Sequence, residues 1–117
     1  MRDSLRDKLC LEHIIDACDR IASYYPIDNV PVLDIKSIEF FGLVKNLEII
    51  GEASYKLTKD FIQNHPETNW RQIIGMRHIM VHGYYNVKPI VVKQIIESEI
   101  ANLRRQVDIY LEEFCED

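Results

Sequence analysis

Arg77 and His82 are the two residues of this sequence whose types and spacing are best suited to chemistry on a phosphate. An arginine guanidinium is a permanently charged, planar fork that fits phosphate oxygens, and a histidine can give and take a proton near neutral pH. Together they could cleave RNA without a metal. The imidazole would assist proton transfer at the 2′-hydroxyl, and the guanidinium would stabilise charge on the phosphoryl oxygens. Arg77 and His82 are therefore the candidate catalytic residues.

The stretch around these two residues is locally cationic. Residues 70–96 contain no Asp or Glu, but they contain Arg71, Arg77, Lys88 and Lys93. The whole chain of 117 residues has a formal net charge of −5, which argues against a general nucleic-acid coat protein, because non-specific affinity depends on the number of Lys and Arg presented. Any nucleic acid must therefore bind locally, at this stretch, where Lys88 is a candidate supporting residue.

Other interpretations of the same residues remain open. His78 and His82 have the i, i+4 spacing that can clamp a metal, but the stretch has no Glu and no third His, so no metal site and no cofactor are predicted. Arg77 and His82 could instead bond only the carbonyl groups at a helix end, where Arg and His are favoured. Tyr84 and Tyr85 could be packing residues.

The elements that must position these residues are predicted to be helices. Apolar residues recur with helical spacing from Ser4 to Tyr25, from Ile35 to Phe61, from Trp70 to Val81 and from Pro89 to Phe114. The connections are short and no stretch alternates as a strand would. The pattern predicts an all-α, antiparallel up-and-down bundle of four to five helices in a single domain, residues 1–117.

Polar residues are predicted to mark the helix boundaries. Asp34 is expected to cap the second helix, and Asn86 is expected to cap the last one, with Pro89 in its first turn. Thr68 or Asn69 is expected to cap the helix that begins at Trp70. Gly83, just past His82, is well suited to end that helix.

The second predicted helix has two unusual features. Gly42 and Gly51 interrupt a strong helical pattern at a cost of about 1 kcal/mol each relative to Ala, so we expect them to allow a bend or a close contact between helices. Lys45, Asn46 and Glu52 interrupt its apolar residues. Either they lie on the solvent face, or one of them supports the site from the facing helix.

Helical geometry separates the two predicted catalytic positions. Residues five apart on an ideal helix lie about 140° apart around the axis, whereas Arg77 and Tyr84, seven apart, share a face. His82 must then approach Arg77 either by fraying at Gly83 or from a second subunit. A homodimer with two copies of the motif facing across a cleft would satisfy this requirement.

The sequence also predicts the compartment. Cys10, Cys18 and Cys115 are an odd set without a C-x-x-C spacing, which suits reduced thiols in the cytosol. The charged N-terminus does not resemble a signal peptide, and no apolar stretch has the length needed to span a membrane. A cytoplasmic protein without membrane contact is predicted.

Three blocks of the sequence resemble one family. Arg77, four further residues, His82, Gly83 and Tyr84 are similar to the R-x-x-x-x-H-x-Y signature of the HepT toxin family, within the HEPN superfamily of small α-helical ribonucleases. Residues 46–53 resemble the second-helix segment of that family. Pro66, Trp70 and residues 74–77 resemble its approach to the motif, in the same order along the chain.

The resemblance implies a toxin of a two-component toxin–antitoxin system that acts as a metal-independent endoribonuclease. It implies a homodimer with Arg77 and His82 at the dimer cleft, and RNA as the substrate. It also implies a partner, the small nucleotidyltransferase antitoxin MntA, which neutralises such toxins by attaching AMP from ATP to the motif tyrosine. In this chain that residue would be Tyr84.

Two positions depart from the family pattern. Family members usually have Asn after the motif arginine, where this chain has His78, and an acidic residue is common where it has Asn86, Val87 and Lys88. The second departure makes the stretch more cationic, which favours RNA. The departures also leave open an alternative of another class: a non-catalytic helical subunit that binds a nucleotidyltransferase and presents a tyrosine for modification.

Overall fold

The computed structural model describes residues 2–82 and 86–114, and in these ranges every regular element is a helix. The elements are α1 (Arg2–Tyr24), α2 (Ile38–Tyr55), α3 (Lys59–Asn64), α4 (Trp70–His82), α5 (Pro89–Ile95), the π-helical turn η2 (Ile96–Ile100) and α6 (Ala101–Glu112). The last three follow one another without a break. The predicted all-α bundle is therefore confirmed. No helix in the described ranges is both long enough and apolar enough to cross a membrane.

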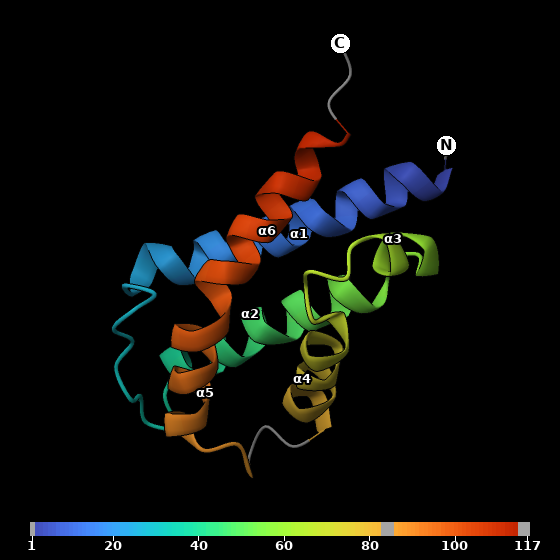
Figure 1. Ribbon diagram of the computed structural model, residues 1–117. Helices are drawn as coiled ribbons and strands as arrows, with labels where there is room; N and C mark the ends of the chain where they lie inside the picture. Colours follow the sequence, from blue (N-terminus) through green and yellow to red (C-terminus); the bar gives the residue numbers. More distant parts are fainter. Residues whose placement is uncertain (1, 83–85, 115–117) are drawn as a thin grey trace.

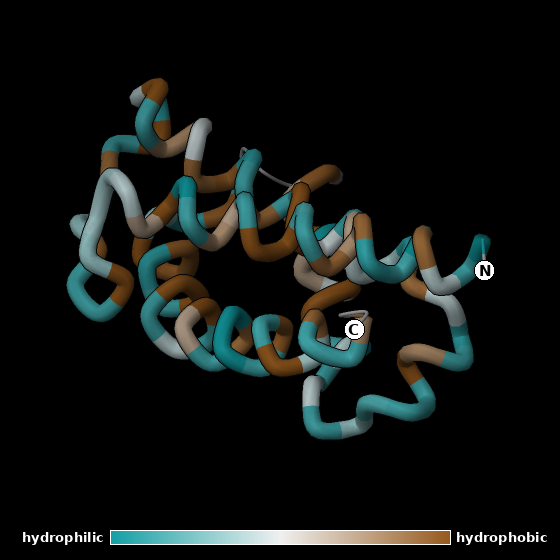
Figure 2. The backbone as a smooth tube through the Cα atoms, turned by 90° about the horizontal axis from the view of Figure 1, so that it is seen from above, coloured by the Kyte–Doolittle hydropathy of each residue, from teal (hydrophilic) through white to brown (hydrophobic). Residues whose placement is uncertain are grey.

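Helix α2 lies at the centre of the bundle. In Figure 1 it runs between α1 and α6 above it and α4 and α5 below it. Its most extensive contacts are with α4 and α1, and α6 packs on α1. Figure 2 shows hydrophobic and hydrophilic residues alternating along the helices, as the helical spacing of the apolar residues requires.

The core consists largely of the side chains that the helical pattern predicted. Cys18 is buried, and so are Leu103, Val107 and Tyr110 of α6. Burial, together with the nearby carboxylate of Asp19, raises the pKa of the Cys18 thiol to about 12. The thiol therefore stays neutral and acts as a small apolar side chain.

The second predicted helix, which was expected to run from Ile35 to Phe61, is wrong at both ends. Ser37 caps α2 instead of Asp34, and its hydroxyl accepts a hydrogen bond from the backbone N–H of Phe40. At the other end α2 stops at Tyr55, and Thr58 caps the separate helix α3. The buried Asp7 of α1 accepts bonds from the N–H and the hydroxyl of Thr58, both at 2.8 Å, and so stabilises the break.

The last helix also begins differently from the prediction. Its N-cap residue is Lys88, which makes no side-chain capping bond, and Asn86 lies before it. Pro89 occupies the first turn as expected. The helical spacing predicts that Val81 of α4 faces the core, but it is 37% exposed.

Helix α4 is held firmly where it begins. Asn69 accepts a bond from the N–H of Gln72 at 3.2 Å, so Asn69 is the side chain that caps it. The indole of Trp70 donates to the carbonyl oxygen of His65 at 3.0 Å, and the hydroxyls of Thr68 and Tyr110 are 2.7 Å apart. These contacts tie the start of α4 to α3 and α6. They therefore fix the orientation of α4, the helix on which Arg71 and Arg77 lie.

Candidate functional site

The backbone of Arg77 on α4 lies directly against Gly51 of α2. A Cβ atom added at Gly51 would lie 2.3 Å from the Cβ of Arg77 and 2.9 Å from its Cα. Real Cβ atoms do not approach backbone atoms so closely, so only glycine permits this contact between the two helices. The expected close approach is confirmed at Gly51. At Gly42 an added Cβ would meet nothing within 4 Å.

Two further residues on the same turn of α2 contact the Arg77 side chain. Glu52 accepts a charge-assisted hydrogen bond from Arg77 Nε through its Oε2 atom. The guanidinium carbon of Arg77 lies 5.2 Å from the centroid of the Tyr55 ring, within the range of a cation–π interaction. Gly51 thus contacts the backbone and Cβ of Arg77. Glu52 contacts its Nε atom, and Tyr55 lies beside its guanidinium carbon. We call these three residues the arginine seat.

Of the three polar residues considered for support of the site, only Glu52 contacts Arg77. Asn46 is buried and links helices, because its side chain donates to the carbonyl oxygen of Gly42 at 2.8 Å and accepts from Arg20 of α1 at 2.7 Å. Lys45 is exposed and lies 3.4 Å from Glu48. The sequence predicted that one of these three residues could support the site, but it did not show that Glu52 is the one.

The ion pair between Arg77 and Glu52 is accessible to water. The side chain of Arg77 is 29% exposed and that of Glu52 is 36% exposed, and the other carboxylate oxygen of Glu52 lies 3.8 Å from Lys56 Nζ. Ion pairs this exposed typically contribute about 0–1 kcal/mol to stability. The pair therefore contributes more to the orientation of Arg77 than to the stability of the fold.

The structure describes only some of the other predicted site residues. His78 is exposed on α4, and Lys88 is exposed at the start of α5. His82 is the last residue of α4, and its backbone continues the helix that carries Arg77. Tyr84 lies outside the described residues. The structure therefore brings Glu52 and Tyr55 to Arg77, and it leaves the contact between Arg77 and His82 a prediction.

The sequence alone does not identify Tyr55 as part of the site. The only available signal was its position on α2, four residues after Gly51 and three after Glu52, which places it on the same helix face. That position becomes informative only once Gly51 is seen to contact Arg77. In the sequence alone, Tyr55 resembles any aromatic residue near a helix end.

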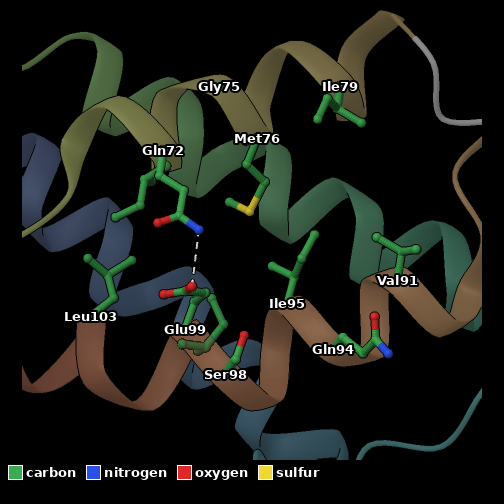
Figure 3. A pocket seen from close by; sticks show the side chains of 12 residues that line it. Gln72, Gly75, Met76, Ile79, Val91, Gln94, Ile95, Ser98, Glu99 and Leu103 are labelled. Atoms are coloured by element: carbon green, nitrogen blue, oxygen red, sulfur yellow. Dashed lines mark hydrogen bonds between the residues drawn. The ribbon is translucent and has the colours of Figure 1, made fainter.

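An apolar cavity of about 410 Å³ lies between α4 and the α5–η2 segment (Figure 3). Met76 and Ile79 line it from α4, and Ile95 lines it from α5, as Figure 3 shows. Gln72 donates to Glu99 across it at 3.2 Å. Neither Arg77 nor His78 lines this cavity, so it is separate from the arginine seat.

Among the residues that the structure describes, no group of three or more His, Cys, Asp or Glu side chains is placed to hold a metal ion. The chemistry visible in this part of the chain is that of a guanidinium held in place on a helical scaffold. Such a group binds and stabilises anions, phosphates above all. Fold and site together define a small all-α protein with a preorganised arginine on its central helix pair.

Comparisons with known proteins identify the family. The family described as Ribonuclease HepT-like matches residues 14–109. Among curated proteins, the chain is 29% identical over 108 residues to a candidate RNase of Methanocaldococcus jannaschii, MJ1380, covering 91% of this chain and 98% of that protein. It is 34% identical over 103 residues to a candidate RNase of Caldanaerobacter subterraneus, TTE0752, covering 83% of this chain and 87% of that one.

A shorter match reaches a protein named for the family itself. Over 64 residues the chain is 38% identical to a candidate ribonuclease HepT of Thermococcus cleftensis, covering 55% of this chain and 58% of that protein. No solved structure gives a significant match. The chain belongs to the HepT-like ribonuclease family.

The two glycines of α2 provide a direct test of the arginine seat. We expect Gly51→Ala to lower the free energy of unfolding by about 1–3 kcal/mol, because the new methyl group must push α4 away from α2. We expect Gly42→Ala to raise it by up to about 1 kcal/mol, because Ala favours the helix and the space there is open. Urea unfolding of both variants measures the difference. Equal effects of the two substitutions would contradict the close contact.

Proposed function

We propose that this protein is a metal-independent endoribonuclease that acts as the toxin of a toxin–antitoxin system, with Arg77 and His82 as its catalytic residues. The observation that carries the proposal is family membership over residues 14–109, combined with the motif arginine held on α4 by the arginine seat. The candidate RNases that the chain resembles along most of its length support RNA as the substrate.

The reaction follows from the chemistry of the two residues. The 2′-oxygen of a ribose attacks the adjacent phosphorus while the bond from phosphorus to the 5′-oxygen breaks, leaving a 2′,3′-cyclic phosphate and a 5′-hydroxyl. His82 moves the proton, and Arg77 stabilises the charge that gathers on the phosphoryl oxygens. His78, Tyr84 and Lys88 are proposed to bind the substrate around them. His78 and Lys88 are exposed, as substrate-binding residues must be.

A homodimer is proposed as the active form. Near the end of α4 and the start of α5, apolar side chains are exposed: Ile79 by 54% and Val91 by 40%, both lining the cavity between these helices, Ile90 by 42%, and Val81 by 37%. Exposed apolar side chains favour contact with another protein surface. A second copy seated here would bring two motifs together, which compensates for the five-residue spacing of Arg77 and His82 along α4.

The first test compares Arg77→Ala and His82→Ala with the wild-type chain on a single-stranded RNA. We expect Arg77→Ala to lower kcat by about 10²–10³-fold through lost charge stabilisation. We expect His82→Ala to lower it by about 10²–10⁴-fold through lost proton transfer. Circular dichroism should show both variants folded at room temperature. Unfolding of either variant would instead favour a structural role for that residue.

The matched controls are an exposed histidine and an exposed arginine elsewhere on the molecule, His13→Ala on α1 and Arg105→Ala on α6. Both should keep wild-type rates. In cells, induction of the wild-type chain should arrest growth and induction of His82→Ala should not. Arrest by both would favour the alternative of a non-catalytic subunit that acts by binding a nucleotidyltransferase.

The second test concerns the partner, an MntA-like nucleotidyltransferase that attaches AMP to Tyr84. An AMP there would place a negative phosphate where the substrate phosphate is expected, and it would compete for Arg77 through charge-assisted bonds. Mass spectrometry after co-expression with such a nucleotidyltransferase should find one or more AMP units on Tyr84. Tyr84→Phe should escape modification, and Tyr85→Phe should not. An adduct on Tyr85, or on neither tyrosine, would contradict the assignment.

A further inference from the structure

We propose that Glu52 is a positioning residue for Arg77: its carboxylate holds the Nε–H of the guanidinium and so orients the terminal nitrogens toward the RNA phosphate. This inference rests on the proposed ribonuclease function. It adds a residue outside the Arg77–His82 motif, from a different helix, to the set on which catalysis depends. Glu52 itself does not touch the substrate; it acts through Arg77.

Glu52 bonds Arg77 through the one N–H donor that does not lie at the end of the side chain. A guanidinium has five N–H donors, one on Nε and four on the two terminal nitrogens. Glu52 accepts from Nε of Arg77 and not from its terminal nitrogens. This contact is therefore compatible with parallel donation from the two terminal nitrogens to two phosphate oxygens, the geometry in which arginine binds phosphate most strongly.

The arginine seat restricts the side chain at three points. Gly51 fixes the backbone at the base of Arg77, Glu52 holds Nε, and the ring of Tyr55 lies 5.2 Å from the guanidinium carbon. A free arginine side chain samples many rotamers, and ordering it only when the substrate arrives costs binding energy. Here the orientation is set before RNA binds, which is the condition for efficient stabilisation of a transition state.

The charge of Glu52 distinguishes positioning from simple attraction. A carboxylate beside the phosphate site repels the phosphate, so its removal should not weaken substrate binding by itself. If Glu52 matters because it orients Arg77, its loss should lower kcat while KM stays constant or falls. If it were only part of the fold, substrate affinity and stability would suffer together.

The kinetic test compares Glu52→Gln with Glu48→Gln. Glu48 lies one turn earlier on α2, carries the same charge and pairs with Lys45 rather than Arg77, so it controls for the change in net charge. We expect Glu52→Gln to lower kcat by about 10–100-fold, because small displacements of a catalytic group cost that much, with KM unchanged or lower. Glu48→Gln should leave kcat unchanged.

A second variant, Glu52→Asp, distinguishes the effect of the negative charge from the effect of side-chain length. Asp keeps the negative charge but is shorter by one methylene group, so it should lose contact with Nε and lower kcat with KM near the wild-type value.

In an Arg77→Lys background, which lacks the Nε donor, Glu52→Gln should have no further effect on kcat. A full effect of Glu52→Gln in that background would overturn the proposal, and so would a wild-type kcat for Glu52→Gln.

A measurement independent of activity tests the contact itself. The Nε–H resonance of Arg77, identified in a ¹H–¹⁵N spectrum by its loss in Arg77→Lys, should shift in Glu52→Gln and stay in place in Glu48→Gln. An unchanged resonance in Glu52→Gln would overturn the positioning role. If the wild-type chain cleaved no RNA while this shift was seen, the ribonuclease proposal would fail, whereas the hold of Glu52 on Arg77 would stand.

Discussion

The close contact between α2 and α4 at Gly51 determines where Arg77 lies. Because a Cβ at this point would overlap Arg77, the two backbones can approach only through glycine. Once they approach, Glu52 and Tyr55 on the same turn come within reach of the arginine side chain. The glycine costs about 1 kcal/mol of helix propensity, and that cost is offset by packing between the central pair of helices.

The rest of the bundle fixes α2 so that this contact can hold. Asn46 links α2 to Arg20 of α1, and Asp7 of α1 stabilises the point where α2 ends and α3 begins. The contacts at the start of α4 set the direction of the helix that ends at His82. A partly exposed arginine thus takes its position from residues on another helix, which buried groups in turn hold in place. For this reason we expect effects on activity from residues that never meet the substrate.

The helical spacing of apolar residues predicted most of the fold, because burial of one helix face is a local requirement that the sequence must show. It could not predict that α2 stops at Tyr55, since the apolar spacing continues through Leu57 and Phe61, and the deciding contact comes from Asp7, 51 residues away from Thr58. The candidate site, too, could be predicted only in part from the sequence. Residue chemistry singled out Arg77, but choosing Glu52 over Asn46 depends on how α2 is rotated against α4, which is a property of the packed bundle.

We propose that Arg77 and His82 promote cleavage of RNA by its own 2′-hydroxyl. The most direct measurement is mass spectrometry of the fragments that the purified chain produces from RNA, and from a DNA strand of matching sequence, in excess EDTA. We expect RNA fragments with 2′,3′-cyclic phosphate and 5′-hydroxyl ends, and an intact DNA strand. Cleavage of the DNA, RNA fragments with 5′-phosphate ends, or complete loss of activity in EDTA would contradict it.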